Sequence, residues 1–148
     1  MNEIQIYTDG GARGNPGPAA SSFVVIKDNK TIFEDSIFLG TATNNMAEYQ
    51  AVLAAYNWLS IFLKNISVNR INFFLDSQLV VNQLNGKYKI KSVKLKPIIE
   101  NILNIQNKIK CEISYSFIRR KYNRRADFLL NKKLDDSIKK ISRSAEKD

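Results

Sequence analysis

The chain has 148 residues, and its 44% of hydrophobic and 25% of charged residues are ordinary for a globular protein of one domain. It has no histidine and one cysteine, Cys111, which excludes Ser-His-Asp catalysis, histidine-ligated metal sites and a disulfide framework. No apolar run reaches the roughly 18 residues of a membrane helix, and the N-terminus lacks a signal pattern, so a cytoplasmic protein without a membrane partner is expected.

The net charge of +9 is unevenly distributed along the chain. Residues 1–85 carry 5 Lys and Arg against 7 Asp and Glu, whereas residues 86–148 carry 18 against 7. Such asymmetry favours a polyanion bound against the C-terminal part of the chain. A solvated lysine-rich surface explains the same counts, so charge alone leaves both interpretations open.

The first third of the chain is predicted to form three strands and a long helix. Residues 3–9 alternate in polarity like a strand, and the glycine-rich segment 10–18 is expected to end it as a loop. The next two strands are expected to form a hairpin around Asp28-Asn29. The remaining expected elements here are strands at 22–27 and 31–39 and a helix at 45–63, which is rich in alanine and bulky apolar residues.

The rest of the chain alternates strands with helices. The apolar run at 70–75 predicts a strand buried on both faces. Further expected elements are a helix at 77–84, a lysine-rich link at 87–96, a helix at 98–109, a strand at 112–118 and a helix at 125–140.

The resulting order, βββαβααβα, predicts an α/β protein with a mixed five-stranded sheet and helices on both faces. Residues 1–141 are expected to form this one domain. Residues 142–148 are expected to be a polar C-terminal tail.

Four carboxylates are candidates for a shared site. Asp9 and Asp76 each end a predicted strand, and parallel neighbours would bring both to the carboxyl edge of the sheet, where ligands bind in such folds. Glu48 and Asp127 share helix faces with apolar residues and therefore point inward. Buried charges need partners or cations, so the four together favour a site for hard divalent ions.

Each carboxylate also has a purely structural interpretation. Asp9-Gly10 is a common turn dipeptide, and Asp76 could cap the helix that begins at Ser77. Asn45 and Glu48 have the spacing of a capping box. Asp127 lies in a first helical turn, where a negative charge suits the helix dipole.

The segments around these carboxylates resemble the type 1 ribonuclease H family, in its histidine-free branch, and this resemblance implies an RNase H-like fold. The resemblance runs in order from about Ile4 to Leu134, nearly the whole chain. Its motifs are YTDGG at 7–11 with GNPGP at 14–18, TNNMAE at 43–48, LDSQLV at 75–80 and NRRAD at 123–127.

This resemblance implies an endoribonuclease that hydrolyses the RNA strand of RNA–DNA hybrids and leaves 5′-phosphate and 3′-hydroxyl ends. It further implies two Mg²⁺ ions, with Mn²⁺ as a substitute, held around the scissile phosphate by four side chains that serve both as catalytic and as metal-binding residues. These are Asp9, Glu48, Asp76 and Asp127.

The same resemblance supplies a set of expected substrate contacts. Amides both donate and accept hydrogen bonds, as a ribose 2′-hydroxyl does, and Thr43 matches a contact to a phosphate of the DNA strand. Arg120 stands in a loop where many relatives carry a histidine. The family-derived contacts are Asn15, Thr43, Asn44, Asn45, Gln78, Arg120 and Asn123. The charge pattern adds Lys87, Lys89 and Lys91 as a grip on the DNA strand.

Three alternatives remain open. The chain could be a non-catalytic nucleic-acid-binding module of the same fold. It could be a related enzyme of another kind, such as a resolvase or a 3′–5′ exonuclease, although these lack the TNNxxE and glycine-rich motifs. It could also cleave double-stranded RNA in addition to hybrids. A monomer is expected.

Overall fold

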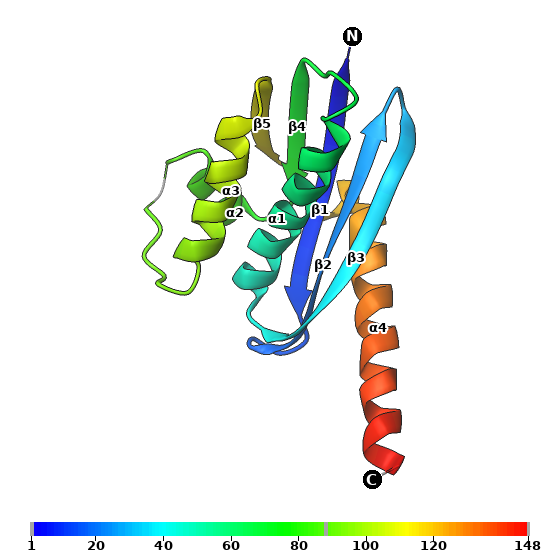
Figure 1. Cartoon of the computed structure of the whole chain (residues 1–148). Coiled ribbons are helices and arrows are strands. Elements are labelled where there is room, and N and C mark those ends of the chain that lie inside the picture. Colours follow the sequence, from blue (N-terminus) through cyan, green and yellow to red (C-terminus); the bar gives the residue numbers. More distant parts are fainter. Residues whose placement is uncertain (1, 88, 148) are drawn as a thin grey trace.

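A computed structural model describes residues 2–87 and 89–147 (Figure 1). Its elements follow the predicted order, with one additional short 3-10 helix before the last helix. They are β1 (Glu3–Ala12), β2 (Gly17–Lys27), β3 (Lys30–Ala42), α1 (Asn44–Phe62), β4 (Arg70–Leu75), α2 (Gln78–Leu84), α3 (Lys96–Lys108), β5 (Glu112–Phe117), η1 (Arg120–Tyr122) and α4 (Arg124–Lys147).

The five strands form one mixed sheet in the order β3-β2-β1-β4-β5. The first three strands pair antiparallel, and β4 and β5 continue the sheet parallel to β1. The predicted α/β class and the mixed five-stranded sheet are therefore confirmed. Because β1 and β4 are parallel neighbours, Asp9 and Asp76 lie toward the same carboxyl edge.

The glycine-rich segment does not behave as a loop. We expected residues 10–18 to end the first strand, but β1 continues to Ala12 and β2 begins at Gly17. Antiparallel pairing explains the difference, since Gly10 faces Ser21 and Ala12 faces Ala19 in an unbroken register. Only residues 13–16 form the connection, so the acidic Asp9 lies inside a paired strand.

The hairpin between β2 and β3 is confirmed. Asp28 and Asn29 connect the two strands, and both have positive φ angles, of 53° and 63°. Two residues with positive φ define the turn type whose twist suits a tight hairpin, and Asp and Asn tolerate that conformation best after glycine.

The main core lies between one face of the sheet and the helices α1 and α3. Ile4, Ile6, Ile71 and Phe73 project from β1 and β4, and each is fully buried. Helix α1 crosses this face, and α3 packs against α1 (Figure 1). Helix α4 packs on the opposite face, against β1, β2 and β3, so the prediction of helices on both faces is confirmed.

Strand β4 is covered on one face only, contrary to expectation. Ile71, Phe73 and Leu75 are buried beneath α1 and its neighbours, whereas Asn72 and Phe74 on the other face are half-buried. The reason is the position of α4, which packs on β1 to β3 at the far side of the sheet (Figure 1). The apolar run therefore leaves part of an aromatic surface uncovered.

Helix α4 is longer than predicted. It was expected to end near Lys140 but extends to Lys147, because residues 141–147 contain no glycine or proline to stop it. Its last part projects beyond the sheet (Figure 1), and residues 139–146 are exposed. In the part of the chain that the structure describes, no helix has the length and hydrophobicity to cross a membrane.

Candidate active site

Three carboxylates from three separate elements meet at the carboxyl edge of the sheet. Asp9 comes from β1, Glu48 from the second turn of α1, and Asp76 from the residue that follows β4. Each offers an oxygen that lies within 4.8 Å of the others. Asp9 and Glu48 are 3% and 8% exposed, so this is a buried acidic cluster and not a solvated surface.

The structural interpretations of three of these carboxylates are wrong. Asp9 and Gly10 lie inside the paired strand β1 and form no turn. Thr43, not Asn45, is the N-cap of α1, and its hydroxyl accepts a hydrogen bond from the Met46 amide at 3.2 Å. Glu48 therefore lies outside a capping box. Ser77 caps α2 by accepting from the Val80 amide at 3.4 Å, which leaves Asp76 without a capping role.

The protein alone does not satisfy the cluster. Glu48 Oε2 and Asp76 Oδ2 are buried without a hydrogen-bond partner. Burial, followed by the nearby charges of Asp76 and Asp127, raises the pKa of Asp9 from 3.8 to about 8. Burial and then the charge of Asp9 raise the pKa of Glu48 well above its ordinary value. Burial also raises the pKa of Asp76, against the opposing charge of Arg120.

Asp127 lines the same cavity but stands apart from the close group of three. It lies in the first turn of α4, where its charge also suits the helix dipole, so that interpretation stays compatible with the structure. The side-chain amide of Asn131 donates to its Oδ1 at 3.2 Å. All four predicted carboxylates thus face one cavity of about 400 Å³.

Close packing at a glycine holds Glu48 next to Asp9. A Cβ atom on Gly10 would lie 2.2 Å from the carbonyl carbon of Ala47 and 2.4 Å from the amide nitrogen of Glu48. Only glycine permits this approach of α1 to β1. A hydrogen bond of 2.6 Å from the Ser21 hydroxyl to the carbonyl oxygen of Ala47 anchors the same turn to β2.

The predicted amide contacts gather at the rim of the cavity. The Asn44 side chain accepts from the Ala12 amide at 2.8 Å, and the Asn15 side chain accepts from the Asn44 amide at 2.9 Å. Asn44 and Asn45 line the cavity, whereas Asn15 and Thr43 brace the start of α1 beside it. The accepting oxygens of Asn15 and Asn44 are engaged, which leaves their N–H₂ groups for a ligand.

Two further predicted contacts come from the segment before α4. The Arg120 guanidinium Nε lies 3.9 Å from Asp76 Oδ2, and its side chain is 82% exposed, so it can turn toward an anion in the cavity. Asn123 is buried, and its amide donates to the Thr8 carbonyl oxygen at 2.8 Å. This places Asn123 as a support for β1 beside Asp9.

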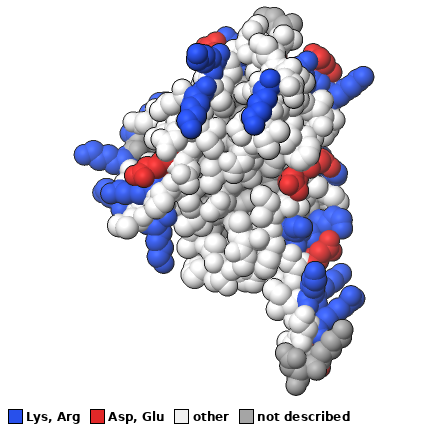
Figure 2. All heavy atoms as spheres, in the orientation of Figure 1, with Lys and Arg blue, Asp and Glu red and all other residues white. Residues whose placement is uncertain are grey.

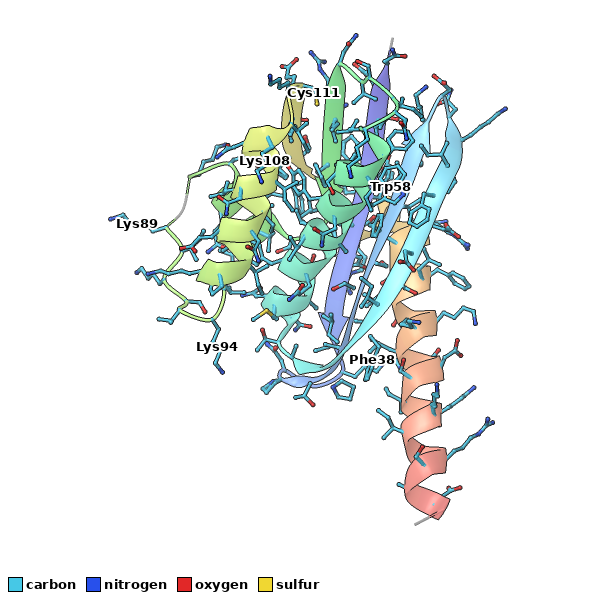
Figure 3. All side chains as sticks on the ribbon, viewed as in Figure 1. Phe38, Trp58, Lys89, Lys94, Lys108 and Cys111 are labelled. Carbon is cyan, nitrogen blue, oxygen red and sulfur yellow. The ribbon has the colours of Figure 1, made fainter. Side chains whose placement is uncertain are left out.

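The remaining predicted contacts lie outside the cavity. Gln78 is exposed at the start of α2. Lys87, Lys89 and Lys91 are exposed on the link between α2 and α3, and Figure 3 shows Lys89 projecting away from the body. Figure 2 shows Lys and Arg side chains along this edge and along the projecting part of α4. Tyr88, in the middle of the link, lies outside the described residues.

Sequence reasoning missed the residues that hold α4 in place beside the site. Ser22 on β2 donates a 2.6 Å hydrogen bond to the carbonyl oxygen of Ala126, next to Asp127. Arg13 lines the cavity and makes a 2.7 Å ion pair with Asp135. Serine hydroxyls in an otherwise apolar strand are a signal that a buried partner exists, but the sequence does not identify the partner.

The chemistry of these donors fits divalent metal ions. Carboxylate oxygens are the preferred ligands of hard cations, and the unpartnered oxygens of Glu48 and Asp76 are available to bind them. Burial and then mutual repulsion raise the pKa values of Asp9 and Glu48, and a bound cation would offset both effects.

Comparison with known proteins agrees with this geometry. The sheet order, with an acidic cavity at the carboxyl edge of its parallel strands, defines the class of RNase H-like folds. A family model described as Reverse transcriptase-like matches residues 7–133. The ribonuclease H of Acetivibrio thermocellus is 30% identical over 152 residues, covering 97% of this chain and 99% of that protein. The chain therefore belongs to the ribonuclease H family.

Two further relatives are similar over most of this chain. The crystal structure of LC11-RNase H1 in complex with RNA/DNA hybrid superposes with a TM-score of 0.87 at 38% identity, covering 91% of this chain and 99% of that one. The bifunctional protein Rv2228c of Mycobacterium tuberculosis is 32% identical over 146 residues. That match covers 97% of this chain but only 39% of the length of the mycobacterial protein.

Proposed function

We propose that the chain is an endoribonuclease that hydrolyses the RNA strand of RNA–DNA hybrids, giving 5′-phosphate and 3′-hydroxyl ends. The observation that carries the proposal is the buried cluster of Asp9, Glu48 and Asp76, whose unpartnered oxygens suit divalent cations. The RNA/DNA hybrid bound by the LC11-RNase H1 relative supports the choice of substrate.

The proposed cofactor is Mg²⁺, two ions per site, with Mn²⁺ as a substitute, held by Asp9, Glu48, Asp76 and Asp127. When bound, such ions stabilise the charge that develops on a phosphate during in-line displacement. The chain has no histidine, so carboxylates or solvent must accept protons during the reaction. Burial of Asp9 and Glu48 excludes bulk water from one side of the site.

Other side chains would position the hybrid. The free N–H₂ groups of Asn15, Asn44 and Asn45 suit the 2′-hydroxyls that distinguish RNA from DNA. Arg120 is the cation nearest the cluster and suits a phosphate oxygen there. We propose further contacts for Thr43 and Gln78, at the N-terminal ends of α1 and α2, and a supporting role for Asn123.

We expect the chain to act as a monomer in the cytoplasm. One chain supplies all four carboxylates of the cavity, so catalysis requires no second copy. The single half-buried cysteine suits a reducing compartment. Light scattering on the purified protein measures the oligomeric state directly.

A panel of substrates and metals tests the proposal. End-labelled RNA–DNA hybrid, double-stranded RNA and double-stranded DNA are each incubated with Mg²⁺, Mn²⁺ or EDTA. We expect cleavage of the hybrid RNA strand with either metal and none with EDTA. A protein that binds the hybrid without cutting it would be a non-catalytic module. Cleavage of double-stranded RNA would extend the substrate range.

Two variants of matched chemistry link the activity to the cluster. Asp76→Asn should lower hybrid cleavage by about 100-fold or more while keeping the thermal stability of the metal-free protein or raising it. Asp28→Asn changes an exposed carboxylate in the β2–β3 turn and should behave as wild type. Substantial Mg²⁺-dependent cleavage by Asp76→Asn would contradict the assignment.

A further inference from the structure

A second cavity lies across Asn123 from the carboxylate cluster. It has a volume of about 200 Å³ and opens between β1, β2 and the junction of η1 with α4. Its walls combine aromatic rings, aliphatic side chains, an amide and cations, which is the composition of a site for a base with its phosphate. The lining residues are Tyr7, Val24, Ile26, Lys121, Tyr122, Asn123, Arg124, Arg125 and Ala126.

A stacked ring pair forms the floor beside this cavity. Tyr7 on β1 and Phe74 on β4 are paired in the parallel register, and their rings stack with centroids 5.0 Å apart. Asp9 follows Tyr7 by two positions on β1, and Asp76 follows Phe74 by two positions, directly after the end of β4, so both carboxylates lie beyond the ring pair toward the carboxyl edge. A strand rises about 3.3 Å per residue, so the ring pair is about 7 Å along the strands from the two carboxylates.

This part of the sheet face is open to a ligand. Helix α4 packs on β1 to β3, and Phe74 is only half-buried. Tyr122, which lines the cavity, is 64% exposed. Beyond the rings, the Ser114 hydroxyl donates to the Asn72 side chain at 2.8 Å, so the surface continues as a polar one over β4 and β5.

Lysine and arginine side chains border the cavity, and not all of them are engaged in contacts that stabilise the fold. Arg125 binds Glu34 through two hydrogen bonds, of 3.0 and 2.6 Å, and Arg124 donates to the Lys121 carbonyl oxygen. The Lys121 amine lies 5.0 Å from the Tyr122 ring centroid and has no carboxylate partner among the described residues. A cation beside an exposed ring matches a phosphate next to a stacked base.

Asn123 forms part of the wall between this cavity and the carboxylate cluster. Asn123 is 1% exposed, and its Oδ1 is buried without a hydrogen-bond partner although its amide group is engaged with Thr8. The hydrogen bond from Asn123 to Thr8 fixes this part of the cavity wall to β1.

We propose that this cavity binds one nucleotide of a single-stranded nucleic-acid segment that continues from the duplex held at the carboxylate cluster. The base stacks against Tyr122 and the Tyr7–Phe74 pair, and Lys121 with Arg124 hold the phosphate. The inference rests on the proposed function, because the neighbouring duplex sets the direction of the strand. It predicts a preference for hybrids that carry a single-stranded flank.

Binding without cleavage tests the cavity directly. The probe is a fluorescein-labelled octauridine, and its anisotropy is followed on the full chain in EDTA at several salt concentrations. Tyr122→Ala should weaken binding by about tenfold, and Tyr122→Phe should restore it because the ring remains. Lys121→Gln should weaken binding and flatten the slope of log affinity against log salt by about 0.7. Lys108→Gln removes an exposed charge at the C-terminal end of α3, away from the lysine link, and is the matched control (Figure 3).

Two more arms separate the possible outcomes. In the first arm, uridine monophosphate is added as a competitor of octauridine. If the mononucleotide displaces the oligomer completely at a similar concentration, the cavity is a site for free nucleotides, and the assignment to a single-stranded segment is overturned. Cleavage of blunt hybrid and of hybrid with an RNA flank is then compared. We expect Tyr122→Ala to abolish the preference for the flank and to leave blunt cleavage unchanged.

Equal octauridine binding by wild type, Tyr122→Ala and Lys121→Gln would overturn the inference. Blunt-hybrid cleavage by the same preparations would still stand in that case, so failure of the cavity assignment is distinguishable from failure of the proposed function. Loss of cleavage in every preparation would instead contradict the proposed function.

Discussion

The hydroxyl of Ser22 donates a 2.6 Å hydrogen bond to the carbonyl oxygen of Ala126, 104 positions later in the chain. Ser22 lies in β2 and Ala126 in the first turn of α4, directly before Asp127. Both residues are buried. This bond therefore ties the helix that carries one carboxylate to the sheet that carries another.

Ser22→Ala should lower both stability and activity. The buried Ala126 carbonyl loses its side-chain partner, which costs about 1–3 kcal/mol in the free energy of unfolding. A displaced Asp127 should also reduce kcat. Urea denaturation and hybrid cleavage measure the two effects. Ser60→Ala removes an exposed hydroxyl that donates to the Asn57 carbonyl oxygen and should change neither. Wild-type kcat in Ser22→Ala would show that Asp127 does not depend on this bond.

Gly10→Ala should separate α1 from β1. The new Cβ atom would lie 2.2 Å from the Ala47 carbonyl carbon, so the helix has to move and take Glu48 with it. We expect a loss of about 2–4 kcal/mol in stability and a large loss of activity, measured by denaturation and hybrid cleavage. Gly11→Ala is the control, because its Cβ atom would make an ordinary 3.5 Å contact with Leu130. Equal behaviour of the two variants would contradict the packing argument.

The stability of the metal-free protein should fall as pH rises. The pKa of Asp9 is about 8 in the folded chain and near 3.8 when exposed. Between these values the folded chain keeps a proton that the unfolded chain has released, so the free energy of unfolding decreases with pH. Melting temperatures in EDTA from pH 5 to pH 8.5 should show this decline. Asp9→Asn should flatten it, and so should Mg²⁺. An unchanged slope in Asp9→Asn would assign the effect to other groups.

The lysine link should act on binding and not on chemistry. Replacement of Lys87, Lys89 and Lys91 by glutamine should raise KM and flatten its salt dependence, because each lost phosphate contact removes about 0.9 from the slope. The kcat at saturating hybrid should stay near wild type. Steady-state kinetics at 50 to 200 mM salt provide the measurement. A retained wild-type salt slope would mean that the hybrid lies elsewhere.

Arg120→Ala should slow hybrid cleavage by about tenfold in kcat/KM, since the cation nearest Asp76 is lost. Arg120→Lys should recover part of that activity because it keeps the charge. Arg143→Ala removes an exposed cation on α4 and serves as the control. Initial rates at subsaturating hybrid measure the effect. Wild-type rates in Arg120→Ala would show that the exposed side chain does not reach the substrate.

Local sequence patterns predicted the elements correctly where the pattern was compatible with only one local structure. The strand at 70–75 has the predicted bounds because its apolar run is a strong local signal, and Asp28-Asn29 forms the predicted turn because both residues tolerate positive φ. The glycine-rich segment was predicted wrongly as a loop. Its strand conformation comes from pairing with β2, which a local pattern does not report.

The same distinction applies to the candidate site. Inward-facing carboxylates were identified from their helix and strand positions, but their closeness depends on tertiary contacts. Gly10 allows the approach of Glu48 to Asp9, and the capping hydroxyls of Thr43 and Ser77 leave the carboxylates free. The burial of β4 was overestimated because the course of α4 across the sheet is set by packing.

The span between Ser22 and Ala126 has a consequence for protein synthesis. Domains fold as their chains emerge from the ribosome, and the first three carboxylates emerge well before Asp127. A nascent chain that ends before α4 therefore has an incomplete cavity, and under the proposed function it would not yet cleave a hybrid. Proteolysis between η1 and α4 would separate Asp127 from the other three carboxylates along the chain, and α4 would then stay on the sheet only through its packing and the bond from Ser22 to Ala126.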